Sequence, residues 1–209
     1  NVSCKGGTRV EIKGVAHTKW IPELTHNESF RQWSLLRMRD FLLKKGVDAE
    51  KWKISSAKVK GSLDSELIIN ARKRGEEVVA VNLPKFEGSL SWFTQPGKSF
   101  SNEISDRLKV IACIEKPNII HSEDLNSSLK EKDLESIKLL LKSNDGDAQI
   151  IFWGPADDIK TALETIEERC IMALKGIPEE TRKSISDGTT IFERVLPGAD
   201  RMYPDTESA

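Results

Sequence analysis

Three short apolar runs, separated by segments with helical periodicity, constrain the fold of this chain more than any other feature of its sequence. Each run is short and rich in β-branched residues, which is typical of a buried strand. The order strand, helix, strand, helix, strand, helix predicts an α+β sandwich in which helices cover a sheet. The expected strands are residues 78–81, 109–114 and 149–153, and the expected helices are near 101–108, 128–141 and 157–174.

A longer helix is expected before this region. Thr25 and Glu28 have the spacing of a capping box, and helical sequence continues to Gly46, which suits the position just after a helix. Apolar residues spread around much of this segment, so the helix should be buried on more than one side. Trp33, and Trp153 in the third run, are expected in the core.

Similar signals mark the helices near the end of the chain. Ser128 and Glu131 have the spacing of a second capping box, and Gly176 follows the last residue of an apolar helical stripe that includes Cys170. Pro178 suits the first turn of another short helix. A further helix is expected near 64–74, and residues 46–62 have the composition of a connector.

The first thirteen residues predict a β-hairpin around Gly6 and Gly7. Two registers are possible, and they differ in which side chains share a face. With residues 5–7 as the loop, an apolar face forms, so this register should be preferred. It places Val2, Cys4, Thr8, Val10 and Ile12 on that face. The opposite face then collects Asn1, Ser3, Arg9, Glu11 and Lys13, and it is either solvated or the floor of a site.

The charge balance excludes a diffusely basic nucleic-acid-binding protein. The 209 residues include 32 lysines and arginines and 33 aspartates and glutamates, a net charge of −1. Residues 31–60 nevertheless hold nine bases and three acids, a net charge of +6. This stretch either faces phosphates or is a solvated helix and linker. The candidates for phosphate contacts are Lys51, Lys53, Lys58 and Lys60.

Cysteine and histidine usage argues against metal and disulfide chemistry in the chain. Three cysteines are widely separated, and no C-x-x-C or H-E-x-x-H spacing occurs. Cys113 and Cys170 are expected at buried positions. The sequence contains no apolar run long enough to span a membrane and no signal peptide, so we expect a cytoplasmic protein. Because the chain starts at Asn1 in strand-like sequence, we also expect it to be part of a longer protein.

We interpret the domain organisation as an insertion. Residues 1–75 would form part of one domain and a connector, residues 76–185 an inserted α/β domain, and residues 186–209 a return to the first domain. A strand is expected at 189–195 within the return segment.

Several unusual strings resemble one protein family in order along nearly the whole chain. The opening NVS and RVEIK resemble the B/E family of glutamyl-tRNA(Gln) amidotransferase subunits. The tail DGTTIFERVLPGADRMYPDT is similar to the matching segment of the archaeal E branch. Between them, VVAVNLPKFEG, TQPG, the D-R-x-K-V pattern of residues 106–110, HSEDL and GIPEETRK also fit.

This resemblance implies an enzyme role. The family is an ATP-dependent carbon–nitrogen ligase that converts Glu-tRNA(Gln) into Gln-tRNA(Gln) with an amide nitrogen donor. Its E-type subunit binds tRNA and activates the glutamyl γ-carboxylate by phosphorylation, which implies ATP and Mg²⁺ as cofactors. An asparaginase-like D-type subunit supplies ammonia. The partners expected for the full-length protein are therefore tRNA(Gln) carrying glutamate and this asparaginase-like subunit.

The resemblance also refines the expected fold. The inserted unit would be a ferredoxin-like GAD domain, which the family shares with bacterial aspartyl-tRNA synthetases, and the flanking segments would belong to a β-rich cradle domain with a kinase-like site. The acidic motif expected near the metal would lie upstream of Asn1. The chain alone is therefore expected to be inactive.

Candidate site residues come from the polar hairpin face and from the tail. Transfer of a phosphoryl group requires bases to balance its charge and an acid to hold Mg²⁺. Glu11 is the candidate metal ligand, and Glu11, Arg9 and Lys13 are the candidate catalytic residues. A second group of candidates is Arg201, Tyr203 and Asp205.

Two other function classes remain open at this point. One is a stand-alone ferredoxin-like module for regulation or protein interaction, without catalysis. The other is a fragment of an aspartyl-tRNA synthetase, against which the absence of class II synthetase motifs argues.

Overall fold

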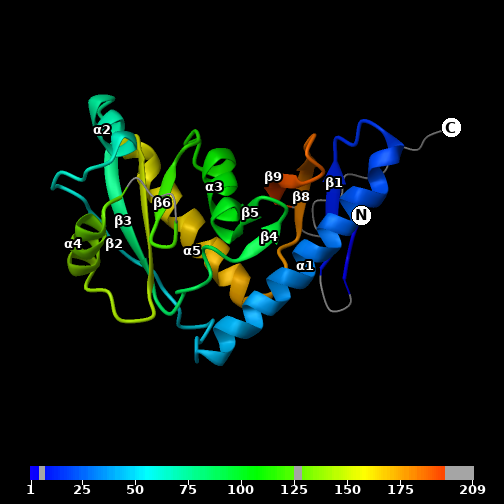
Figure 1. Cartoon of the computed structure of the whole chain (residues 1–209), viewed down its shortest axis with the longest axis horizontal. Coiled ribbons are helices and arrows are strands. Elements are labelled where there is room, and N and C mark those ends of the chain that lie inside the picture. The colour runs from blue at the N-terminus through cyan, green and yellow to red at the C-terminus, as the bar shows by residue number, and fades with distance from the viewer. Residues whose placement is uncertain (5–7, 125–128, 196–209) are drawn as a thin grey trace.

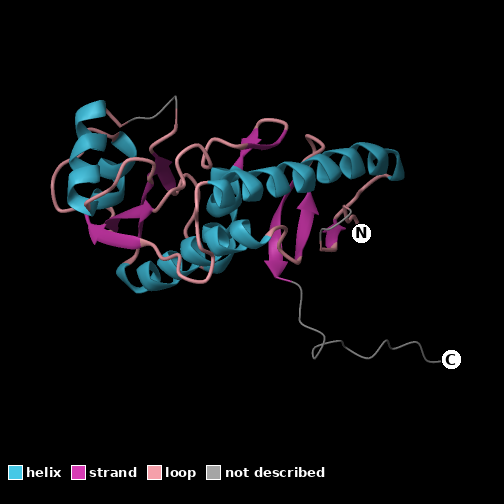
Figure 2. Ribbon diagram, turned by 90° about the horizontal axis from the view of Figure 1, so that it is seen from below, coloured by secondary structure: helices cyan, strands magenta, loops and turns pink. Residues whose placement is uncertain are grey.

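The computed structural model describes residues 1–4, 8–124 and 129–195. A four-stranded sheet with its helices occupies one end of the molecule, and a three-stranded sheet occupies the other (Figure 1). The long helix α1, Ile21–Lys44, passes along the three-stranded sheet in both views (Figure 2). The predicted α+β class agrees with this mixture of helices and largely antiparallel sheets.

The larger sheet has the strand order β2-β3-β7-β6, and all neighbouring strands are antiparallel. Its two central strands are almost entirely buried, because the sheet is covered on both faces. This burial explains why their sequences read as continuous apolar runs instead of alternating ones. The strands are β2 (Ser55–Lys58), β3 (Glu77–Leu83), β6 (Ile119–His121) and β7 (Ala148–Gly154).

Helices cover this sheet on both faces, which gives three layers. Helices α2 (Glu66–Lys73) and α4 (Glu131–Leu141) pack on the face that carries Val78, Ala80 and Trp153. Helices α3 (Phe100–Ile111) and α5 (Ile159–Lys175) pack with α1 on the face that carries Val79 and Phe152. The two faces alternate along each strand, as strand geometry requires.

The smaller sheet has the order β1-β8-β9, with strands β1 (Val10–Lys13), β8 (Glu180–Ser184) and β9 (Thr190–Val195). Strand β1 is parallel to β8, and β8 is antiparallel to β9. Val2 forms an isolated antiparallel bridge with Val10 through two backbone hydrogen bonds of 2.9 Å. This pairing confirms the predicted register, in which residues 5–7 form the loop, although those three residues lie outside the described part of the chain.

Short elements complete the connections. The hairpin of β4 (Phe93–Gln95) and β5 (Lys98–Ser99) packs on α1, and 3₁₀ turns at Thr18–Trp20 and Ala156–Asp158 precede α1 and α5.

Helix α1 begins earlier than the capping signal predicted. Pro22 lies in its first turn, where a missing N–H costs nothing, so the helix starts at Ile21 and Thr25 lies inside it. Glu28 is buried and accepts hydrogen bonds from Arg31 and Gln32, so the predicted capping box is wrong. The C-terminal stop is confirmed, since Gly46 follows with a φ of +78°.

Three other expectations are wrong. Residues 109–111 continue α3 and the chain then turns at Cys113, whose φ is +56°, so no strand forms at 109–114 and Cys113 is exposed. The strand forms instead at β6. Trp33 is 51% exposed because it lies on the outer side of α1, whereas Trp153 and Cys170 are buried as predicted.

The region after α5 also differs from the prediction. Residue Pro178 starts no helix, because the chain enters β8 two residues later. The strand predicted at 189–195 is confirmed as β9. Ser128 lies outside the described residues, and α4 begins at Glu131.

The two sheets divide the chain differently from the expected boundaries at residues 75 and 185. Strand β2, from the expected connector, pairs with β3, and α2 packs on the same sheet. Strand β8, from within the expected insert, pairs with β1. The chain therefore enters the larger unit near residue 46 and leaves it after α5. Within the described residues, every helix is too short or too polar to cross a membrane.

Candidate functional site

The candidate residues of the hairpin come together on the outer face of the three-stranded sheet. Glu11 and Lys13 lie on β1 and Arg9 directly precedes it, so the three alternate with the buried Val10. Glu11 is the register partner of Thr181 on β8, and Thr181 is in turn paired with Arg194 on β9. The row Glu11, Thr181 and Arg194 thus crosses all three strands.

A second row next to it carries more positive charge. Lys13 and Lys183 are register partners on β1 and β8. Glu11 is half-buried and accepts a long hydrogen bond of 3.4 Å from the Thr181 hydroxyl at Oε2. The face therefore presents one oriented carboxylate among several cations, an arrangement that suits a ligand with phosphoryl oxygens. We call Arg9, Glu11, Lys13, Thr181, Lys183 and Arg194 the outer face, in which Thr181 itself is fully buried.

The outer face does not form a complete metal cage. In the part of the chain that the structure describes, no group of three histidine, cysteine, aspartate or glutamate side chains is placed to hold a metal ion. The tail candidates Arg201, Tyr203 and Asp205 lie outside the described residues, so the structure does not place them.

The lysines proposed for RNA contacts are exposed along the segment that leads into and out of β2. Lys51 and Lys53 are exposed on either side of Trp52, which is buried and donates its indole N–H to the Pro84 carbonyl. Lys58 lies on the edge strand β2, where it pairs with Glu77 at 3.0 Å, and Lys60 follows it.

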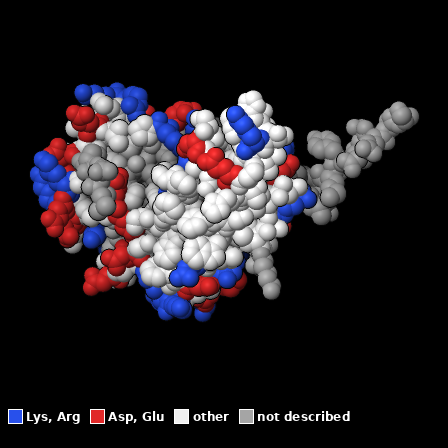
Figure 3. Space-filling model, turned by 45° about the vertical axis from the view of Figure 1, so that its right-hand side comes forward, with Lys and Arg blue, Asp and Glu red and all other residues white. Residues whose placement is uncertain are grey.

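One of the nine bases in the stretch 31–60, Arg31, is fully buried, and six of the nine are exposed. Figure 3 shows lysines, arginines and acids interspersed over one part of the surface, while a wide area over α1 and the β4-β5 hairpin has few charges. The exposed aromatic side chains Trp33 and Phe93, from these two elements, each have about half of their area exposed.

The main feature that sequence reasoning missed is a buried cluster of charged side chains behind the outer face. It lies where α1, α3, α5 and the inner face of the three-stranded sheet meet. The side chains of its ion pairs are at most 3% exposed. The members are Glu28, Arg31, Glu103, Arg107, Arg169, Glu180 and Arg182; we call them the buried ionic cluster.

Glu180 of β8 and Glu103 of α3 organise this cluster. Glu180 accepts hydrogen bonds from Arg31 at 2.6 Å, from Arg107 at 2.7 Å and from Arg182 at 2.8 Å. Glu103 binds Arg31 at 2.6 Å and Arg182 at 3.1 Å. Arg182 also donates to the side chain and the backbone carbonyl of Thr190 on β9. The cluster thereby connects the helices of the larger unit to the smaller sheet.

The attraction of the neighbouring arginines has a larger effect on the pKa values of Glu103 and Glu180 than burial has. Burial alone would raise the pKa of Glu103, but the charges of Arg182, Arg31 and Arg169 hold that pKa well below its ordinary value. Burial also opposes ionisation of Glu180, yet Arg182, Arg31 and Arg107 lower its pKa.

Arg169 differs from the other arginines of the cluster. Burial is the main cause that lowers its pKa to about 10. Its guanidinium lies over the ring of Phe100 at 4.9 Å, but none of its three nitrogens has a hydrogen-bond partner among the described residues.

The sequence carried only part of the signal for the cluster. Arg169 lies three residues after Ile166 and four before Ala173, on the buried side of α5. The sequence predicted no strand at Glu180 and Arg182. Charged residues at core positions are rarely buried unless they are paired.

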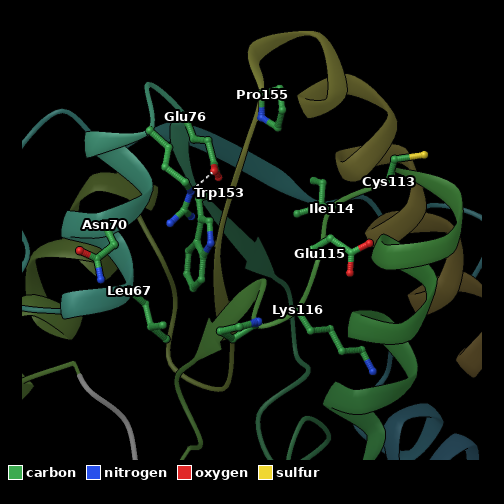
Figure 4. A pocket seen from close by; sticks show the side chains of 11 residues that line it. Leu67, Asn70, Glu76, Cys113, Ile114, Glu115, Lys116, Trp153 and Pro155 are labelled. Carbon is green, nitrogen blue, oxygen red and sulfur yellow. Dashed lines mark hydrogen bonds and ion pairs between the residues drawn. The ribbon is translucent and has the colours of Figure 1, made fainter.

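A separate surface cleft of about 440 Å³ lies between α2 and the segment that joins α3 to β6, beside Trp153 (Figure 4). Its lining includes charges of both signs, and they pair locally. Arg74 contacts Glu76, and Lys116 contacts Asp106. Because its cations are already paired, this cleft is less suited to an anionic ligand than the outer face.

Comparison with known proteins reveals relatives over nearly the whole chain. The chain is 40% identical over 216 residues to the E-type subunit of the glutamyl-tRNA(Gln) amidotransferase of Methanopyrus kandleri. It is 38% identical over 211 residues to that of Pyrococcus furiosus and 36% identical over 209 residues to that of Methanocaldococcus jannaschii. Each alignment covers 99% of this chain and 33% of the relative. No family model matches the sequence.

Proposed function

Because this chain is homologous to the E-type subunit of archaeal glutamyl-tRNA(Gln) amidotransferases, we propose that it is part of the tRNA-binding, ATP-dependent subunit of such an enzyme. The chain spans about a third of the length of the curated relatives it matches. In this proposal the substrate is glutamate carried by tRNA(Gln), the partner is an asparaginase-like D-type subunit that releases ammonia, and the complex works in the cytoplasm.

The proposed reaction activates the glutamyl γ-carboxylate and then forms an amide. An oxygen of the carboxylate attacks the γ-phosphorus of ATP, and ADP leaves. Ammonia then attacks the activated carbonyl carbon, and inorganic phosphate leaves. The first step brings several negative charges together, so it requires cations that are fixed in place before the reaction.

The outer face is the observation that supports this role. Lys13 and Lys183 are adjacent on neighbouring strands, and Arg194 lies one row away. The sheet fixes the backbone positions of these bases, so the spacing of their charges is set before a phosphoryl group binds. In this mechanism the bases stabilise the charge on the transferring group, and Glu11 orients the ligand.

Mg²⁺ belongs to the proposal for the complete subunit. Mg²⁺ usually takes one or two protein carboxylates and completes its shell with water and phosphate oxygens. The described residues offer Glu11 as one such carboxylate, and no group of three or more metal-binding side chains forms around it in that part of the chain. They do not fit a complete site, so the mechanism assigns no step to the ion.

The two structural units can also be assigned to domains of the proposed family. We propose that the three-layer unit corresponds to the ferredoxin-like GAD domain and that the three-stranded sheet is part of the cradle domain. The support is its place in the chain, because the larger unit lies between β1 and β8 of one sheet.

The decisive test replaces Glu11 by glutamine in the full-length subunit, assembled with its partner. We expect kcat for amide formation to fall at least about 100-fold while tRNA binding changes less than twofold, since the carboxylate acts mainly in the transition state. Glu168→Gln, an exposed acid on α5, is the matched control and should leave turnover unchanged. Unchanged turnover of Glu11→Gln at saturating ATP would remove Glu11 from the site.

RNA contacts are tested by the salt dependence of tRNA binding. Replacing Lys51, Lys53, Lys58 and Lys60 by glutamine should weaken binding and flatten the plot of log affinity against log salt by about 0.7–0.9 for each phosphate that is no longer neutralised. Binding should weaken alike for all tRNAs, because phosphate contacts carry no sequence information. The comparison set is Lys85, Lys98 and Lys109. A larger effect in the comparison set would assign RNA binding to another surface.

A further inference from the structure

The buried ionic cluster connects the larger unit to the strand that supports Glu11. Glu103 belongs to α3, which packs on the four-stranded sheet, yet its carboxylate binds Arg182 on the middle strand of the other sheet. It also binds Arg31 through both of its oxygens, at 2.6 and 3.3 Å. One carboxylate thus links α3, α1 and β8.

Arg182 is the point at which this link enters the smaller sheet. Its guanidinium donates to Thr190 on β9 and to Glu103 and Glu180. Because successive residues of a strand point to opposite faces, the neighbouring Thr181 points to the outer face. There Thr181 is paired with Glu11 across β1 and β8 and donates its hydroxyl to that carboxylate.

We propose that Glu103 is a positioning residue for the outer face: it holds Arg182, and through Arg182 the strand β8, so that Thr181 and Glu11 keep their places. This inference rests on the proposed function and adds a role for the larger unit, which is to supply the buried carboxylate that anchors β8. Close-packed interiors do not deform continuously, so loss of this anchor shifts the strand. A shift of about 1 Å at reacting groups costs about 100-fold in rate.

The test uses Glu103→Gln in the full-length subunit within its complex, because glutamine keeps the size of the side chain and removes its charge. We expect kcat to fall at least about tenfold, with the KM for ATP and the affinity for tRNA changed less than twofold. Glu103→Asp should recover part of the loss. Hydrogen–deuterium exchange should rise in β8 and β9 and remain unchanged in β3 and β7.

Asp106→Asn is the matched control. Asp106 is also a buried carboxylate of α3, but it pairs with Lys116 and not with the three-stranded sheet. This variant should leave kcat and the exchange of β8 unchanged. Thr181→Val leaves the cluster intact and should lower kcat, because it removes the hydrogen bond to Glu11. If Glu103→Gln does not fold, Glu103→Asp tests the anchor, since its shorter side chain should also raise the exchange of β8.

A double variant decides whether Glu103 acts through Glu11. Glu103→Gln added to Glu11→Gln should cause little further loss of kcat, because the positioned group is already gone. The proposal is overturned if the losses of kcat in the two single variants multiply in the double variant. It is also overturned if hydrogen–deuterium exchange in Glu103→Gln rises equally in both sheets. If Glu11→Gln alone is silent, the assignment of Glu11 fails, while the exchange of β8 still decides whether Glu103 anchors that strand.

Discussion

Glu180→Gln is expected to lower the free energy of unfolding by about 3–5 kcal/mol, the typical cost of breaking a buried ion pair from one side. Glu180 is fully buried and is the shared partner of Arg31, Arg107 and Arg182. Its replacement leaves three guanidinium groups in the interior with only Glu103 and Glu28 to balance them.

The same residues predict the acid sensitivity of the protein. The pKa values of Glu103 and Glu180 are lowered in the folded state, so both carboxyls bind protons more weakly there than in the unfolded chain. Their contribution to stability is therefore present above the unfolded pKa, about 4.3. It is lost as the pH falls through the lower folded values. Glu180→Gln should reduce this part of the pH dependence.

Urea denaturation at pH 7 measures the effect. The neighbouring exposed acid provides the control, and Glu179→Gln should change the unfolding free energy by less than about 0.5 kcal/mol. A loss below about 1 kcal/mol for Glu180→Gln would mean that the cluster contributes little and that water replaces the carboxylate.

Arg169→Met should have the opposite effect on stability to Glu180→Gln. We expect it to raise the free energy of unfolding by about 1–3 kcal/mol, because apolar replacement of buried charges is often stabilising. The fall in the pKa of Arg169 from 12.5 to about 10 means that the fold disfavours its charged form. At about 1.4 kcal/mol per pKa unit, that penalty is about 3 kcal/mol, and it is fully present at pH 7, below both values.

Methionine keeps the length and the apolar stem of arginine, so it can remain packed on Phe100. It also relieves the repulsion from Arg107 and Arg31. Arg107→Met is the comparison, since Arg107 donates to Glu180 and its loss should destabilise the protein. If Arg169→Met is destabilising by more than about 1 kcal/mol, Arg169 contributes through its contact with Phe100 and its attraction to Glu103.

Much of the local structure was predictable from the amino-acid sequence. Continuous apolar runs marked β3 and β7, since strands buried on both faces need no polar positions. The glycines after α1 and α5 marked the helix ends. The alternation of residues 1–13 fixed the hairpin register, because only one register hides an apolar face. The unusual strings of the chain identified its relatives.

The sheet that each strand joins and the burial of the charged side chains depend on tertiary packing. β8 lies beside β1 although about 170 residues separate their pairing partners, so no local pattern could place it in that sheet. Arg31 and Glu180 are 149 residues apart in sequence and meet at 2.6 Å. Hydrophobic periodicity predicts an apolar interior, and it assigns charged residues to the surface. Charges can be buried only where opposite charges meet them in three dimensions, and that meeting depends on how the two sheets and three helices pack together.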